Sequence, residues 1–220
     1  MTYKLIVFDI YGTLFDVRSI DGAIDQLESE RTKEIGALWR KTQLEHAFLR
    51  QAMQSYVDFE EITINALRYA LNYYNVGHTE KEIQYIASKY TDLTLFEDAK
   101  GLLKKAPIAD YAILSNGTDH MLDQLAYNKE VDQHFKYIIS VDQIRQFKPS
   151  PASYRLILNK SKLKREDILY VSSNSWDING ASSFGFDTAW VNRNGELFND
   201  NGSKPTYEIK DLSELTQLVQ

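Results

Sequence analysis

The sequence predicts an α/β fold, in which a doubly wound, Rossmann-like parallel sheet is interrupted by an inserted helical cap domain. A short apolar run, Tyr3–Asp9, ends on a charge, as a buried parallel strand does. Residues 17–92 contain no proline and carry apolar residues at helical spacing. From about residue 96, strand-like and helix-like segments alternate, which is typical of right-handed βαβ units.

The first strand is expected within Tyr3–Asp9, and the helical insertion follows Phe15. Its first apolar stripe comprises Ile35, Leu38, Trp39, Thr42, His46, Leu49 and Met53. A second stripe runs from residue 62 to residue 74. Thr79–Glu82 has the pattern of a capping box and predicts the start of a third helix. We therefore expect a helical cap over residues 16–95.

The remainder of the chain predicts the rest of the sheet. Candidate strands are Tyr111–Ser115, Tyr137–Ser140, Ile168–Ser172 and Thr188–Asn192. Helices are expected near residues 98–106, 118–128, 151–160 and 176–184. Residues 193–206 contain two Asn-Gly pairs and are interpreted as surface turns. The catalytic α/β core is then residues 1–15 plus 96–220.

Composition excludes several functional classes. The chain has 220 residues, 43% of them hydrophobic, which is ordinary globular usage. A net charge of −6 without a basic block argues against a nucleic-acid partner. No apolar run approaches the roughly 20 residues of a membrane span, and the N-terminus does not resemble a signal peptide. Cysteine is absent, which excludes thiolate chemistry and suits the cytoplasm that we expect.

Candidate catalytic side chains follow the predicted strands. Open parallel sheets bind ligands at the carboxyl ends of their strands. Asp9 ends the first strand, Ser115-Asn116 ends the next, and Asp177 follows the strand Ile168–Ser172 after a short loop. A later loop supplies Lys148. Each residue alone is equally typical of a turn or a solvated surface, but their meeting at one sheet edge favours a catalytic site.

These segments resemble the four-motif pattern of the haloacid dehalogenase superfamily. The motifs are Phe8–Leu14, Ser115–Gly117, Lys148-Pro149 and a closing Asp177. The resemblance covers the whole chain, including the cap inserted after the first motif. Within the superfamily the chain is most similar to the type II L-2-haloacid dehalogenases. The segments that carry this narrower resemblance are Phe8–Asp16, Ala37–Arg40, Leu114–Gly117, Ser140–Asp142 with Lys148-Pro149 and Tyr154, and Val171–Asp177.

Two positions support the narrower resemblance on chemical grounds. Superfamily phosphatases use a second Asp two residues after the nucleophile as a general acid, and this chain has Tyr11 there. They also hold Mg²⁺ with acids after the fourth strand, where one of the two positions is Ser173 here. Mg²⁺ needs several oxygen ligands, with carboxylates prominent. Displacement of a halide fits better, because the halide needs no proton and no phosphate charge must be neutralised.

The resemblance implies catalysis through an aspartyl ester without a metal or other cofactor. Asp9 would displace the halide, and Asp177, with Asn174, would activate the water that hydrolyses the ester. Lys148 would balance the two carboxylates. Three further residues complete the implied catalytic set: Thr13 would hold the nucleophile, Tyr154 would orient Lys148 or Asp9, and Ser172 belongs to the same group.

The resemblance also implies a set of substrate-binding residues. Ser115, with the region of Tyr11 and Asn116, would bind the substrate carboxylate. Arg40 from the cap, with Asn116, would receive the halide. The apolar wall around the substrate tail would comprise Leu44, Phe59 and Trp176.

Structural roles remain open for some of these residues. Core packing is the alternative for Tyr154, Leu44 and Phe59, and a plain surface charge is the alternative for Arg40. Lys41 occupies a position where related dehalogenases carry an uncharged glutamine. An extra cation there would alter the site only if it faces the substrate.

Three functional hypotheses follow. The leading one is a metal-independent dehalogenase whose partners are a small halogenated carboxylic acid and the halide ion, and for which the resemblance implies a homodimer. The second is a Mg²⁺-dependent small-molecule phosphatase, against which Tyr11 and Ser173 argue. The third is a non-enzymatic member whose cap binds a protein, against which the retention of Asp9, Lys148 and Asp177 argues.

Overall fold

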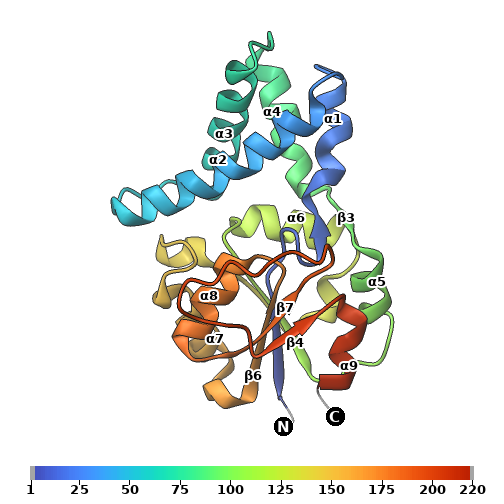
Figure 1. The fold of residues 1–220 in the computed structure, drawn as a ribbon, viewed down its shortest axis with the longest axis vertical. Coiled ribbons are helices and arrows are strands. Elements are labelled where there is room, and N and C mark those ends of the chain that lie inside the picture. The colour runs from blue at the N-terminus through green and yellow to red at the C-terminus, as the bar shows by residue number, and fades with distance from the viewer. Residues whose placement is uncertain (1–2, 219–220) are drawn as a thin grey trace.

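A six-stranded parallel sheet forms the base of the molecule. The computed structural model describes residues 3–218. The strand order is β5-β4-β1-β6-β7-β8, with β1 at the centre (Figure 1). The strands are β1 (Leu5–Phe8), β4 (Asp110–Ser115), β5 (Tyr137–Ser140), β6 (Ile168–Ser172), β7 (Asp187–Val191) and β8 (Tyr207–Ile209). Every residue of β1 and β6 is buried, as continuous apolar strands between two helical layers must be.

Helices connect the strands and cover the sheet. They are α5 (Glu97–Leu103), α6 (Asp119–Asn128), α7 (Pro151–Ser161), α8 (Ser175–Phe184) and α9 (Leu215–Leu218). Short 3₁₀ turns join them: η3 (Asp132–His134), η4 (Val141–Ile144), η5 (Arg165–Asp167) and η6 (Leu212–Glu214). Figure 1 shows α7 and α8 together on one side of the sheet and α5 on the other. The doubly wound α/β core predicted from the sequence is confirmed.

The helical cap stands above the carboxyl edge of the sheet (Figure 1). It comprises η1 (Val17–Ile20), α1 (Asp21–Asp25), α2 (Thr32–Ala52), α3 (Phe59–Tyr73), α4 (Glu80–Ser88) and η2 (Lys89–Thr91). The predicted capping box is present, because the Thr79 and Glu82 side chains each accept from the other's backbone N–H. No helix within residues 3–218 has the length and apolar character needed to cross a membrane.

A small antiparallel ribbon joins the cap to the core. It consists of β2 (Phe15–Asp16) and β3 (Thr94–Leu95). The sequence pattern did not predict this ribbon or β8, although it predicted the other five core strands within two residues of their bounds. Two-residue strands show no period, and β8 buries only Ile209 fully. Their pairing partners lie far away in the sequence, so local patterning could not reveal them.

Candidate active site

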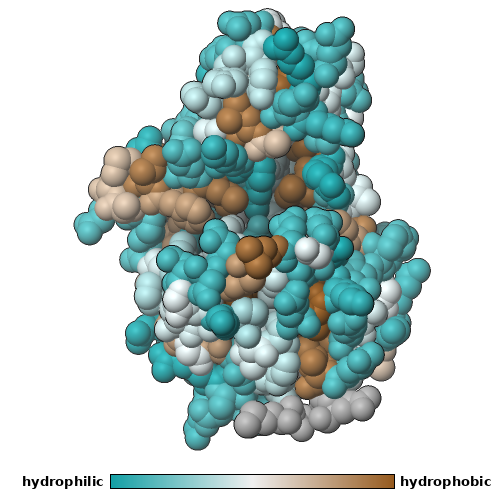
Figure 2. All heavy atoms as spheres, viewed as in Figure 1, coloured by the Kyte–Doolittle hydropathy of each residue, from teal (hydrophilic) through white to brown (hydrophobic). Residues whose placement is uncertain are grey.

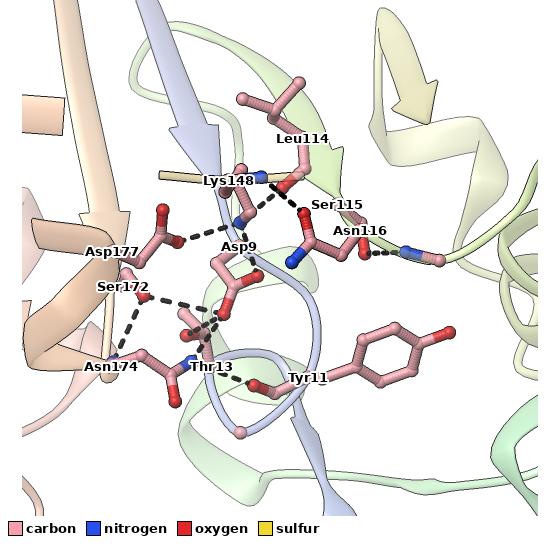
Figure 3. Close-up of polar contacts among 12 residues, drawn as sticks. Asp9, Tyr11, Thr13, Leu114, Ser115, Asn116, Lys148, Ser172, Asn174 and Asp177 are labelled. Carbon is pink, nitrogen blue, oxygen red and sulfur yellow. Dashed lines mark hydrogen bonds and ion pairs between the residues drawn. The ribbon is translucent and has the colours of Figure 1, made fainter. Parts of the chain in front are cut away.

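The carboxyl ends of β4, β1 and β6 bring the predicted catalytic residues together (Figure 3). Asp9 follows β1, Ser115 ends β4 with Asn116 directly after it, and Asp177 lies in the first turn of α8 after β6. Lys148 comes from the loop between η4 and α7. Since β1 lies between β4 and β6, Asp9 occupies the centre of the group.

Both carboxylate oxygens of Asp9 are held in place. Oδ1 accepts a hydrogen bond from Lys148 Nζ at 2.8 Å. Oδ2 accepts from Asn174 Nδ2 at 2.7 Å and from Thr13 Oγ1 at 3.2 Å, and Ser172 Oγ lies 3.5 Å away. Only 3% of the Asp9 surface is exposed. Four predicted residues thus surround the carboxylate and fix its orientation.

Lys148 lies between the two carboxylates of the site. Its Nζ is 2.8 Å from Asp9 Oδ1 and 2.8 Å from Asp177 Oδ2. It also donates to the Leu114 carbonyl and to the Tyr170 hydroxyl, each at 3.0 Å. Burial disfavours the ammonium ion, but the two carboxylates outweigh burial and raise the pKa of Lys148. Lys148 is therefore a permanent cation at the base of the site.

Asp177 is completely buried and is held by two tyrosines. Tyr154 Oη donates to its Oδ1 at 2.7 Å, and Tyr170 Oη donates to its Oδ2 at 3.0 Å. Burial raises the pKa of Asp177, and the charge of Lys148 opposes this rise. A buried carboxylate with a raised pKa has the character of a general base.

The two tyrosines differ from the sequence expectation. Tyr154 was expected to orient Lys148 or Asp9, yet its hydroxyl contacts Asp177 instead. The reason is that α7 packs against α8, and Gly180 of α8 has no Cβ. A Cβ at position 180 would collide with the Tyr154 hydroxyl, so the glycine leaves the space in which that hydroxyl lies. Tyr170 was missed altogether. The sequence does contain an indication of its role. Tyr170 carries a hydroxyl group within an otherwise apolar strand and lies two positions before Ser172, so both side chains are on the same face of β6.

The loop after Asp9 is fixed from several directions. Gly12 adopts a φ of +86°, which a residue with a Cβ would resist. Ser173 Oγ donates to the Gly12 carbonyl at 2.7 Å, and Ser173 N donates to Thr13 Oγ1 at 2.9 Å. Arg193, also missed from sequence, donates to the Thr13 carbonyl at 2.8 Å. Ser173 therefore holds the loop after Asp9 in place.

The predicted substrate-binding residues of the core lie beside this loop. Tyr11 stacks on Phe59 of the cap at 6.0 Å between ring centroids, and burial raises the pKa of Tyr11. Figure 3 shows its ring pointing away from the carboxylates, while its carbonyl accepts from Asn174 Nδ2. Ser115 Oγ accepts from the backbone of Gly117 at 3.1 Å. Asn116 Oδ1 accepts from the backbone N–H of Lys148 at 2.9 Å.

Arg40 lines a cavity of about 610 Å³ beside the β2 connection. The cavity wall includes Asp16, Trp39 and Tyr90. Arg40 is half-buried and donates to Gln43 Oε1 at 2.7 Å. Asp9, Lys148 and Asp177 do not line this cavity, and the binding role of Arg40 remains a prediction.

The apolar wall is assembled only in part. Phe59 joins the site through its stack on Tyr11, and the Trp176 ring lies 5.7 Å from Lys148 Nζ. Leu44 is half-buried on α2, one turn after Arg40, and its contact with substrate remains a prediction. Lys41 is exposed.

The model of the haloacid dehalogenase-like hydrolase family matches residues 3–185. The chain belongs to this family. A (S)-2-haloacid dehalogenase of Pseudomonas sp. (strain CBS-3) is 37% identical over 97% of this chain and 94% of its own. Haloacetate dehalogenase H-2 of Moraxella sp. (strain B) is 37% identical over 98% of this chain and 97% of its own.

A solved relative shows the same fold with a ligand attached. It is an L-2-haloacid dehalogenase from Xanthobacter autotrophicus with chloropropionic acid covalently bound. It is 33% identical, covers 99% of this chain and 98% of its own, and superimposes with a TM-score of 0.93. The resemblance read from the sequence motifs is therefore confirmed at the level of family and fold, cap included.

Proposed function

We propose that this protein hydrolyses short L-2-haloalkanoic acids to D-2-hydroxyalkanoic acids through an ester on Asp9. One observation carries the proposal: Asp9 lies at the end of β1 with both oxygens oriented and its charge balanced by Lys148. A carboxylate prepared in this way is suited to nucleophilic attack. The dehalogenase relatives and the covalent complex of one of them support the same reaction.

In the first step, an oxygen of Asp9 attacks Cα of the substrate from the side opposite the halogen. A C–O bond forms while the carbon–halogen bond breaks, and the halide leaves with the bonding electron pair. The configuration at Cα is inverted. Lys148 contacts both Asp9 and Asp177, and one cation between two carboxylates offsets their repulsion.

In the second step, water attacks Cγ of the Asp9 ester. Asp177 takes one proton of the water and returns it to the departing oxygen of the 2-hydroxy acid. The Asp9 carboxyl group then releases the second proton of the water to solvent, which regenerates the carboxylate. The hydrogen bonds from Tyr154 and Tyr170 hold the Asp177 carboxylate for this role. Asn174 and Ser172 orient the ester carbonyl from the side of Oδ2.

We assign substrate binding to both faces of the site. Ser115, with the region of Tyr11 and Asn116, binds the substrate carboxylate, and Arg40 with Asn116 receives the halide. Phe59, Trp176 and Leu44 enclose the substrate tail. The buried stack of Tyr11 on Phe59 supports the assignment of these two residues.

A direct assay separates this function from the alternatives. The protein is offered 2-chloropropionate in EDTA and, separately, a phosphate ester with Mg²⁺. We expect chloride release that survives chelation and no phosphate release. Phosphate release, or chloride release that stops with EDTA and returns with Mg²⁺, contradicts the proposal. Absence of both favours the protein-binding alternative.

Isotope labelling tests the ester. In a single turnover in H₂¹⁸O with excess enzyme, we expect label in the Asp9 carboxylate, because water attacks Cγ of Asp9. Label found directly in the hydroxy acid would show that water attacks Cα of the substrate instead. Mass spectrometry of the peptide that contains Asp9 distinguishes the two.

We also propose the domain limits, assembly and location expected from the sequence. The β2–β3 ribbon supports limits for the cap near residues 16 and 95. Leu49 on α2 and Met53 directly after it are exposed, and Figure 2 shows hydrophobic residues along the protruding end of that helix. Both favour a homodimer, which sedimentation tests. The absence of cysteine suits the cytoplasm.

A further inference from the structure

The guanidinium group of Arg40 is held by an uncharged partner. Its NH1 donates to Gln43 Oε1 at 2.7 Å. Among residues 3–218, the ion pairs of the structure do not include Arg40. Arg40 and Tyr90 line the same cavity beside β2. Arg40 therefore carries a positive charge that no ion pair neutralises among these residues.

Gln43 is the centre of a buried polar network inside the cap. The residue is completely buried on α2. Its Nε2 donates to Thr63 Oγ1 on α3 at 2.6 Å. Its Oε1 accepts from Tyr90 Oη at 3.2 Å as well as from Arg40. A buried amide is costly without partners, and here both ends of the amide are satisfied.

The network leaves only one orientation for the amide. The Thr63 hydroxyl donates its single proton to the Phe59 carbonyl at 2.6 Å, so Thr63 Oγ1 can only accept from Gln43. Gln43 must therefore present its NH₂ group to Thr63 and its oxygen to Arg40. Trp39 Nε1 donates to the Thr63 carbonyl at 2.8 Å and ties α2 to α3 at this level.

We propose that Gln43 is a positioning residue that directs Arg40 toward the anion bound in the site. This inference rests on the proposed function and extends it to a residue outside the substrate contacts. A carboxylate in place of Gln43 would orient Arg40 equally well but would neutralise its charge. The amide oxygen fixes the guanidinium while leaving that charge for the substrate or halide. Tyr90, which packs edge-on against Tyr11 at 5.5 Å, links the network to the loop after Asp9.

Steady-state kinetics with 2-chloropropionate, with bromide as an inhibitor, test the inference. In Gln43→Met we expect KM and the bromide inhibition constant to rise about tenfold, with kcat within about threefold. In the Arg40→Ala background, Gln43→Met should add no more than about twofold. Equal effects in both backgrounds, or a fall in kcat alone, would show that Gln43 only supports packing of the cap.

Gln43→Glu adds a second measurement, the pH dependence of KM, which would not change if Gln43 served only to pack the cap. The introduced carboxyl group pairs with Arg40 when ionised, so its KM should exceed that of Gln43→Met at high pH and recover as the pH falls. A KM defect that is independent of pH contradicts the proposal. If the Gln43 variants do not fold, Thr63 offers a second test. Thr63→Val removes the acceptor of the Gln43 amide and should raise KM in the same way, whereas Thr63→Ser keeps the acceptor and should leave KM at the wild-type value.

Bromide binding separates this inference from the proposed reaction. The rise in melting temperature with added bromide requires no turnover. A wild type that releases no halide, yet is stabilised by bromide through Arg40 and Gln43, overturns dehalogenation and supports the positioning role. Halide release with a bromide response unchanged in Gln43→Met overturns the positioning role alone. Neither turnover nor bromide stabilisation overturns both.

Discussion

The core face and the cap face of the site are held together in different ways. On the core face, Asp9, Lys148 and Asp177 are almost completely buried, and their charged atoms all have partners at 2.7–3.5 Å. On the cap face, Arg40 is half-buried and Phe59 contributes an aromatic stack. The core face is a buried array of compensating charges, whereas the cap face contributes the half-buried Arg40 and apolar surface.

Under the proposed function, the core face carries out the reaction and the cap face selects the substrate. A buried charge that loses its partner is penalised by several kcal/mol, so the core face tolerates little change. The cap contacts are single hydrogen bonds and ring stacks, each of which contributes about 1 kcal/mol. We therefore expect the sensitivity to substitution to fall steeply from the core face to the cap face.

Asp9→Asn should have the largest effect on the core face. A neutral amide cannot displace a halide, so kcat should fall on the order of 10⁴-fold or more. The melting temperature should stay within a few degrees of wild type, because the amide keeps the shape of the side chain. The exposed residue Asp119 supplies the control, and Asp119→Asn should retain full activity. Residual turnover without deamidation, checked by mass spectrometry, would remove Asp9 as the nucleophile.

Lys148→Met should combine loss of activity with loss of stability. Two buried carboxylates would lose their common cation, which should lower the free energy of unfolding by about 3–5 kcal/mol and kcat/KM by on the order of 10³-fold. The pKa of Asp177 should rise further without this cation, so the acid limb of any remaining activity moves to higher pH.

Urea unfolding at several pH values checks the sign of this effect. Since protonation relieves the unpaired carboxylates, the destabilisation should be largest at high pH and should shrink as the pH falls. A second substitution, Asp177→Asn, should recover part of the lost stability. A destabilisation that does not change with pH would show that Lys148 matters for packing rather than charge.

Tyr170→Phe should produce an intermediate effect. The variant removes a hydrogen bond to Asp177 and an acceptor for Lys148. We expect kcat to fall about tenfold and the acid limb to move to higher pH, because the pKa of Asp177 should rise further. Tyr111→Phe is the matched control, since Tyr111 is a buried tyrosine of β4 that packs on Phe8. Equal pH profiles in the two variants would show that the Tyr170 hydroxyl does not influence the titration of Asp177.

Lys41→Gln should have the smallest effect. Lys41 is exposed on α2 although it directly follows Arg40, because neighbours on a helix point about 100° apart. We expect kcat/KM for short and longer 2-haloacids to change by less than about twofold. A change in chain-length preference would place Lys41 at the substrate after all and would weaken the division between the two faces.

Local sequence patterns predicted most of the fold. The strand Ile168–Ser172 and the helix that starts near Pro151 were correct because apolar runs, proline at a helix start and capping residues act over a few neighbours. The motif order also placed Asp9 and Asp177 on adjacent strand ends, and β1 and β6 are indeed neighbours. The edge strand β8 and the β2–β3 ribbon were missed, because their pairing is not local.

The residue types of the site could be read from the sequence alone, since Asp9 and Asp177 follow predicted strands and Lys148 belongs to a spaced motif in a later loop. The tertiary structure alone decided which groups hold them. Tyr154 contacts Asp177 because α7 packs on α8 at Gly180. The partners of Tyr170 and Gln43 are known only from the folded structure. The Tyr170 hydroxyl on β6 donates to Asp177, and the Gln43 amide oxygen on α2 accepts from Arg40. Hydrogen bonds act over about 3 Å, and the chain joins these partners only after folding has brought distant segments together.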